Sequence, residues 1–151
     1  MLFKTHLAFG VLFILLFLPR VDYKFTFIVI ALIATLLPDI DQGYSKVGHH
    51  KLFRPLQFFV KHRGVMHSLT ICFLISLVLA YFPFTVQWAL PFFLGYGLHL
   101  FADSFTREGI QPFWPYNGVS KGFLKTGSYT ETMILITLLV VDVFVAVVVF
   151  R

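Results

Sequence analysis

The chain has 151 residues, of which 58% are hydrophobic and only 13% are charged, and 20 of them are phenylalanine. A soluble domain of this length carries about 25% charged residues, so the composition indicates a single membrane-embedded domain spanning residues 1–151. The net charge of +5 does not indicate a direct nucleic-acid partner, because the Lys and Arg residues lie beside apolar segments, where topology and lipid headgroups explain them.

Five apolar segments predict an all-α fold, an integral membrane bundle of about five helices. The first segment has no small-residue cleavage site after it, so we expect it to be retained rather than removed as a signal peptide. The second stops at Pro38, and Ser68 is a favourable N-cap for the third. Between these two helices, Leu52–Val60 mixes Phe with polar residues and is predicted to lie on the headgroups. The predicted helices are residues 7–18, 25–37, 68–82, 85–103 and 133–150.

The Lys and Arg residues are distributed unevenly over the loops of this five-helix bundle. Nine of the twelve fall on one side of the membrane and three, Arg20, Lys24 and Arg151, on the other. The positive-inside rule places the side with nine in the cytoplasm, so we expect a multi-pass protein of a cytoplasmic membrane with its amino terminus inside. All six histidines and three of the five aspartates then lie at the cytoplasmic face.

His99 and Asp103 are the strongest candidates for a functional site. They are four residues apart, so on a helix they project from one face and can hold the same ion. An ionisable pair at the end of an apolar helix is costly unless it is paired, hydrated or coordinated; a simple helix-end ion pair is the alternative. Because histidine and carboxylate are the usual ligands of Zn²⁺, and also bind Mn or Fe, we expect one or two divalent cations.

Other candidate ligands fall at the same face of the predicted bundle. Asp39 and Asp41 follow the proline that breaks the second helix, where carboxylates two residues apart can converge on an ion from extended backbone; helix capping and solvation are the alternative. His62 and His67 flank a glycine that can bend the chain, so one or both can serve as ligands. His6 stands alone at the start of the first helix, where a structural role is an equal alternative.

Three further residues are candidates for catalysis rather than for metal binding. Arg63 is predicted to hold a phosphate or an anionic transition state, with ordinary headgroup contact as the alternative. Glu108 and Glu131 are on the predicted cytoplasmic side, and either can orient a ligand or act as general base. Asp142 lies in the middle of the last helix, away from this cluster, and is expected to have a structural or coupling role.

Four motifs occur in order along the chain. They are Thr-His at 5–6, Leu-Pro-Asp-Ile-Asp at 37–41, His-Arg-Gly-x-x-His-Ser at 62–68, and Gly-Tyr-x-x-His-x-x-x-Asp-x-x-Thr-x-x-Gly at 95–109, which is followed by Phe-Trp-Pro at 113–115. Together they resemble the YdjM family, described as LexA-binding, inner-membrane-associated, metal-dependent hydrolases. The resemblance implies a prokaryotic inner-membrane protein with metal-dependent hydrolase activity and a LexA-type protein partner.

The order of ligands is also distantly similar to that of the zinc-dependent phospholipases C and the single-strand-specific zinc nucleases. By that similarity, one aspartate of the second motif, one histidine of the third, and His99 with Asp103 hold one zinc. Asp103 then bridges to a second ion held partly by His6. No histidine follows His99, so the later histidine-carboxylate pair of those enzymes has no counterpart and a third metal is not expected.

The sequence therefore predicts a membrane-embedded metal-dependent hydrolase with its metal site at the cytoplasmic face. The expected substrate is a phosphoester in a lipid or lipid-linked molecule, attacked by a metal-activated water. One alternative is a metal-stabilised membrane scaffold that binds a cytoplasmic partner such as a LexA-type regulator. A second alternative is a small metal or proton transporter.

Overall fold

A computed structural model describes residues 1–41 and 65–151, with Ile40 and Asp41 described by their backbone only. This part of the chain is all-helical and contains no strand, which confirms the all-α part of the predicted fold. The segment Leu52–Val60, predicted to lie on the headgroups, falls outside the described residues. The elements are α1 (Phe3–Phe17), η1 (Leu18–Arg20), α2 (Lys24–Leu36), η2 (Leu37–Asp41), η4 (Val65–His67), α4 (Leu69–Tyr81), α5 (Val86–Ser104) and α6 (Tyr129–Phe150).

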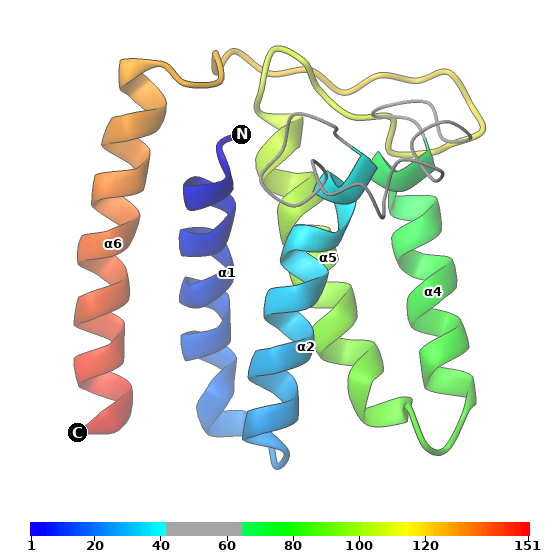
Figure 1. Cartoon of the computed structure of the whole chain (residues 1–151), viewed down its shortest axis with the longest axis vertical. Helices are drawn as coiled ribbons and strands as arrows, with labels where there is room; N and C mark the ends of the chain where they lie inside the picture. The colour runs from blue at the N-terminus through cyan, green and yellow to red at the C-terminus, as the bar shows by residue number, and fades with distance from the viewer. Residues whose placement is uncertain (42–64) are drawn as a thin grey trace.

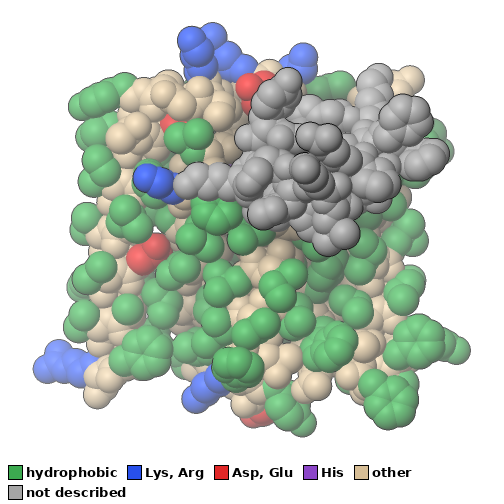
Figure 2. All heavy atoms as spheres, in the orientation of Figure 1, with side chains coloured by type: hydrophobic (Ala, Val, Ile, Leu, Met, Phe, Trp, Pro, Cys, Tyr) green, Lys and Arg blue, Asp and Glu red, His purple; other side chains and the backbone are tan. Residues whose placement is uncertain are grey.

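The five α-helices of residues 1–41 and 65–151 run side by side and alternate in direction along the chain (Figure 1). The amino terminus, η2, η4 and the segment 105–128 lie at one end of the bundle, here called the loop end. The connections 18–23 and 82–85 and the carboxyl terminus lie at the other end, so α1 and α6 are parallel. Figure 2 shows hydrophobic side chains over most of one face, with Lys and Arg toward its two ends, as expected for a bundle in a membrane.

The helix boundaries follow local signals that the sequence carries. Ser68 caps α4 as predicted, because its Oγ accepts a hydrogen bond from the Ile71 N–H at 3.3 Å. The last helix starts at Tyr129 rather than at the predicted Met133, because Ser128 is its N-cap and accepts from the Glu131 N–H. The polar first turn of α6 therefore belongs to the helix and not to the preceding loop.

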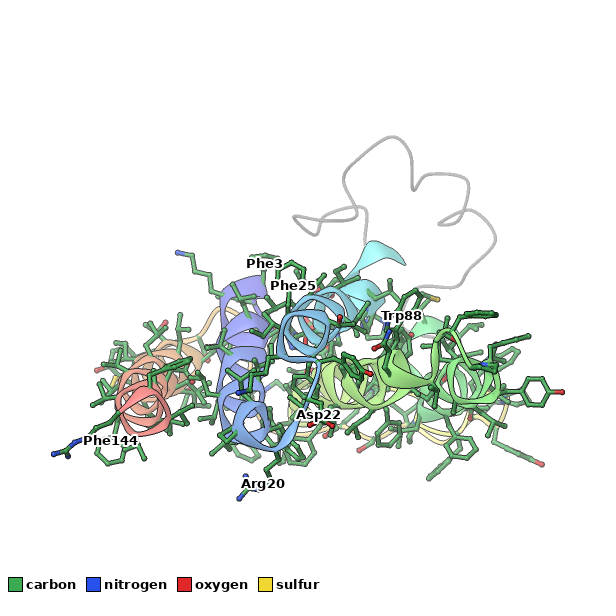
Figure 3. All side chains as sticks on the ribbon, turned by 90° about the horizontal axis from the view of Figure 1, so that it is seen from below. Phe3, Arg20, Asp22, Phe25, Trp88 and Phe144 are labelled. Carbon is green, nitrogen blue, oxygen red and sulfur yellow. The ribbon has the colours of Figure 1, made fainter. Side chains whose placement is uncertain are left out.

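Among the described residues, two helical segments are long and apolar enough to cross a membrane, Phe3–Arg20 and Tyr129–Phe150, and α4 is a shorter apolar helix. In the view along the helices, α6 stands at the side of the bundle next to α1, and Phe144 projects outward from it (Figure 3). Most side chains of α6 are exposed, and its few buried ones lie at Glu131, Leu138 and Asp142. The apolar outer surface of α6 therefore suits contact with lipid.

Small residues bring α1, α2 and α5 close together in the centre of the bundle. The contact between α2 and α5 is the most extensive of any helix pair. A Cβ atom on Gly95 of α5 would lie 2.3 Å from the Ala31 carbonyl oxygen of α2, so only glycine fits there. On α1, Gly10 faces Thr35 of α2, whose hydroxyl would lie 3.1 Å from a Cβ at that position. Close backbone approach of this kind is how helices associate in membranes.

Replacing Gly95 by alanine is expected to destabilise the bundle by roughly 1–3 kcal/mol, because overpacking forces α2 and α5 apart. Gly97→Ala is the matched control, since a Cβ there meets no atom within 4 Å and alanine favours helix. Thermal unfolding followed by circular dichroism in detergent measures both variants. A Gly95→Ala midpoint equal to that of Gly97→Ala would contradict the close contact.

Candidate metal centre

Five ionisable side chains meet inside the bundle at the loop end. They come from four separate elements, α1, η2, η4 and α5, and each is 5% exposed or less. Charged groups are seldom buried unless they are paired or bind a metal, so this convergence is the strongest functional signal in the described part of the chain. The five are His6, Asp39, His67, His99 and Asp103.

Asp103 lies at the centre of this cluster. Its Oδ1 is 3.2 Å from His6 Nε2, and its Oδ2 is 3.6 Å from His67 Nε2 and 3.7 Å from His99 Nε2. The Met1 ammonium also contacts Oδ1. Asp39 Oδ1 lies 3.8 Å from the same Nε2 atom of His99. One aspartate thus faces three imidazoles, and one imidazole faces two aspartates.

The cluster divides into two overlapping triads that share His99. One triad is His6, Asp39 and His99, and the other is His67, His99 and Asp103; the potential ligand atoms lie within 4.8 Å of one another. Ligand atoms about 2.0–2.2 Å from one ion stand roughly 3–4 Å apart. Each triad therefore offers three nitrogen and oxygen donors at close to the spacing that a divalent cation requires.

A hydrogen bond from the neighbouring helix sets the tautomer of His99. Its Nδ1 lies 2.8 Å from the Thr35 carbonyl oxygen of α2. Because a carbonyl only accepts, Nδ1 carries the hydrogen, and Nε2 keeps its lone pair toward the two aspartates. Nε2 makes no hydrogen bond to any described group although it is buried. The His6 ring stacks on His99 with centroids 3.9 Å apart, so both imidazoles have fixed orientations.

Two polar contacts hold His67 at the start of α4. The Tyr96 hydroxyl of α5 donates to the Met66 carbonyl oxygen, and Tyr96 is fully buried. On the other side of His67, Ser68 Oγ donates to the Val65 carbonyl oxygen at 2.7 Å while it caps α4. The backbone on both sides of His67 is therefore fixed before any ligand is bound, which favours a preorganised site.

The cluster concentrates negative charge in a buried place. Burial raises the pKa of the Asp39 carboxyl above its ordinary value, with nearby Asp103 adding to the rise and the histidines opposing it. With neutral imidazoles, the two carboxylates carry two negative charges, one of which the Met1 ammonium offsets. A divalent cation would offset the remaining charge and replace the lost hydration of the carboxylates.

Glu131, a candidate orienter or general base, lies at the edge of the cluster and not in it. It is buried, its Oε1 accepts the Leu2 N–H and its Oε2 accepts the Gly127 N–H, each at 2.6 Å. Both oxygens are engaged by backbone donors, which suits an orienting role. Glu108 is exposed and accepts a hydrogen bond from the Thr126 hydroxyl at 3.3 Å, so the structure does not bring it to the cluster.

The structure brings five of the seven predicted ligands together. From the pairs of alternatives, it places Asp39 and His67 in the cluster, whereas His62, Arg63 and the Asp41 side chain lie outside the described residues. Asp142 is buried on the side of α6 that contacts α1 and takes no part in either triad. Tyr96 belongs to the fourth motif, but its role could not be predicted, and Thr35 lies in no motif, because supporting contacts that involve backbone carbonyls leave no sequence pattern. The small-residue packing of α2 against α5 was the available signal.

Glu131→Ala is expected to loosen the start of α1, because two backbone N–H groups lose a buried charged acceptor, at a cost of roughly 2–3 kcal/mol. Hydrogen–deuterium exchange should report faster exchange in a peptide that covers residues 1–10. Glu108→Ala is the control, since an exposed carboxylate contributes little. Unchanged exchange in Glu131→Ala would show that this residue does not hold α1.

Comparison with known proteins yields a family match. No curated protein and no solved structure matches the chain. A family model described as "YdjM inner membrane protein" matches residues 1–150, which confirms the family that the four motifs predicted and includes every residue of the two triads. The chain belongs to the YdjM family of inner membrane proteins.

Proposed function

We propose that this inner membrane protein is a metal-dependent hydrolase that holds one or two divalent cations at the loop end of its bundle. The observation that carries the proposal is the pair of triads sharing His99, built from five buried ionisable residues of four elements. Zn²⁺ is the first choice for a mixed histidine and carboxylate set, with Mn or Fe as alternatives.

The donors fit such an ion in number, type and charge. The Nε2 of His99 has no hydrogen-bond partner among the described groups and lies 3.8 Å from Asp39 and 3.7 Å from Asp103, and the Nδ1 of His6 also lacks a described partner. Asp103 reaches histidines with both of its oxygens, which suits a carboxylate that bridges two ions. When bound, a divalent cation lowers the pKa of a water molecule and polarises a phosphoryl or carbonyl oxygen.

The protein's own residues would position the reacting groups. Thr35 holds His99 in the tautomer that presents Nε2, and Tyr96 fixes the backbone beside His67. Arg63, which lies outside the described residues, is proposed to hold the anionic group of the substrate. A phosphoester of a lipid or lipid-linked molecule is the proposed substrate class, because the cluster lies at one end of a membrane bundle, where headgroups are found.

One observation favours a non-enzymatic alternative. Every cluster residue is 5% exposed or less, and closed sites of this kind are typical of structural metals, whereas catalytic sites keep a position open. The protein would then be a metal-stabilised membrane scaffold that binds a partner such as a LexA-type regulator. A transporter would need ligands through the membrane thickness, whereas the two triads both lie at the loop end.

His99→Ala and Asp103→Ala are each expected to lose the bound metal, because His99 serves both triads and Asp103 faces three histidines. Metal content is measured by inductively coupled plasma mass spectrometry on detergent-purified protein after reconstitution with Zn²⁺ or Mn²⁺. Glu108→Ala is the matched control and should retain wild-type metal. Equal metal in all four proteins, or none in any after reconstitution, would remove the basis of the proposal.

Hydrolysis is tested on the same preparations with phospholipids and with phosphoesters of long-chain alcohols, and release of phosphate or headgroup is measured. Wild type and Glu108→Ala should turn over, and His99→Ala and Asp103→Ala should lose at least a hundredfold in rate. Metal binding without turnover, together with a lower unfolding temperature when metal is removed, would favour the scaffold.

The proposed cytoplasmic position of the loop end is tested by cysteine labelling in intact cells. Gly118 lies in the exposed loop at this end, and Phe84 is exposed at the other end. Phe84→Cys should react with a membrane-impermeant maleimide, and Gly118→Cys should react only after lysis. The native Cys72 is fully buried and gives a low background. Labelling of Gly118→Cys in intact cells would show that the loop end faces away from the cytoplasm, which is the opposite of the proposed orientation.

A further inference from the structure

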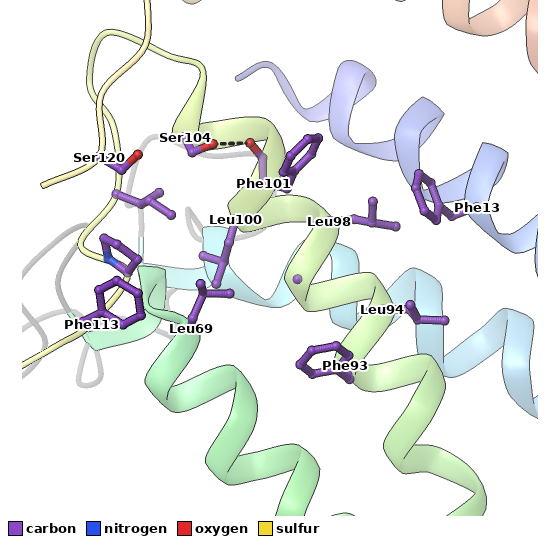
Figure 4. Close-up of a pocket in the computed structure, with 13 residues that line it drawn as sticks. Phe13, Leu69, Phe93, Leu94, Leu98, Leu100, Phe101, Ser104, Phe113 and Ser120 are labelled. Carbon is purple, nitrogen blue, oxygen red and sulfur yellow. Dashed lines mark hydrogen bonds between the residues drawn. The ribbon is translucent and has the colours of Figure 1, made fainter.

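A second feature of the bundle is an apolar groove of about 480 Å³ that runs along α5. Phe13 of α1 and Leu69 of α4 form its two sides, and residues of α5 from Phe93 to Ser104 form its floor (Figure 4). Phe113 and Ser120 of the loop lie at one end of it, and Ile110 also lines it. Its volume lies in the range of small-molecule binding sites, about 300–1,000 Å³.

The groove and the metal cluster lie on different faces of α5. The groove is lined by Gly97, Phe101 and Ser104, which follow one another at helical spacing. His99 and Asp103 are each two residues from Phe101, which places them about 200° around the helix from it. Their side chains contact groups of α1, α2 and η4 instead. The groove is therefore separate from the cluster, and an inference about it does not depend on the proposed hydrolase activity.

The lining of the groove suits a hydrocarbon chain. It is almost entirely apolar, and Phe93 and Phe101 at its edges are 42% and 56% exposed. In an inner membrane protein the medium around such side chains is lipid. A transmembrane helix would pack on a row of small residues, whereas here Gly97 lies between bulky phenylalanines and leaves a channel of limited width.

The loop end of the groove carries two hydroxyl groups, and a basic residue follows one of them in the chain. The hydroxyl-bearing residues Ser104 and Ser120 line the groove there. Ser120 is fixed by a reciprocal backbone pair with Ile110, in which both N–H···O distances are 2.9 Å. The next residue, Lys121, is exposed, and its side chain lies against Gly109, where an added Cβ would be 2.7 Å from Lys121 Cγ. A positive charge beside a hydroxyl-lined end attracts an anionic headgroup.

We propose that this groove is a binding site for an anionic phospholipid. One acyl chain lies along α5 from Ser104 toward Phe93, over the open space at Gly97. The headgroup phosphate lies at the loop end beside Ser120, where Lys121 supplies the opposite charge. Phe113, which is 64% exposed beside this end of the groove, stands at the headgroup level, where aromatic side chains are enriched.

Gly97 offers a direct test, because a side chain there enters the groove without meeting any atom within 4 Å of its Cβ. Gly97→Phe is expected to fill the groove, and Gly97→Ala is the matched control that changes helix propensity but leaves the groove open. Native mass spectrometry of detergent-purified protein titrated with phosphatidylglycerol measures the bound lipid. Wild type and Gly97→Ala should retain one lipid, and Gly97→Phe should bind at least tenfold more weakly.

The headgroup is tested separately with Lys121→Gln and with phosphatidylcholine of the same chains. The proposal expects weaker phosphatidylglycerol binding in Lys121→Gln and weaker binding of phosphatidylcholine to wild type, each by about fivefold. Equal binding in Gly97→Phe and wild type would overturn the groove assignment. If wild type and Gly97→Ala form a dimer and Gly97→Phe does not, the groove binds a second copy of the chain and the lipid proposal is overturned. If Gly97→Phe fails to fold, equal binding of the two lipids to wild type overturns the proposal.

Discussion

The burial of Asp103 among three histidines is the constraint on which the rest of this structure depends. A carboxylate without water is costly, and the bundle surrounds this one with the His6, His67 and His99 imidazoles and the Met1 ammonium. These partners come from the start of α1, the turn before α4 and the body of α5. To satisfy Asp103, the chain must bring these segments to one end of the bundle.

The convergence is made possible by helices that approach closely. Gly95 lets α5 lie against the Ala31 carbonyl of α2, and Gly10 leaves room for Thr35. One turn above that contact, the Thr35 carbonyl accepts the Nδ1 hydrogen of His99. The same close packing that substitutes for a hydrophobic driving force in a membrane thus fixes which nitrogen of His99 faces the carboxylates.

Much of this could be predicted from the sequence because the signals were local. Apolar runs, prolines and the Ser68 cap define the helices, and the spacing of His99 and Asp103 places them on one helix face. The choice between paired candidates such as Glu108 and Glu131 was not local. It depends on which backbone N–H groups lie nearby in space, and the Leu2 N–H is distant from Glu131 in the sequence. The first turn of α6 was missed because its polar residues resemble a loop.

The hydrogen bond between Leu2 and Glu131 joins the first helix of the chain to the last, across 129 positions. Polypeptides are made from the amino terminus, and their earlier segments begin to fold first. The support for the start of α1 is therefore absent until α6 has been synthesised and has packed alongside. A nascent or truncated chain without α6 carries the histidines and aspartates, but it lacks the Glu131 carboxylate that holds the start of α1 and therefore His6. The triad that contains His6 accordingly reaches its final geometry only in the finished protein.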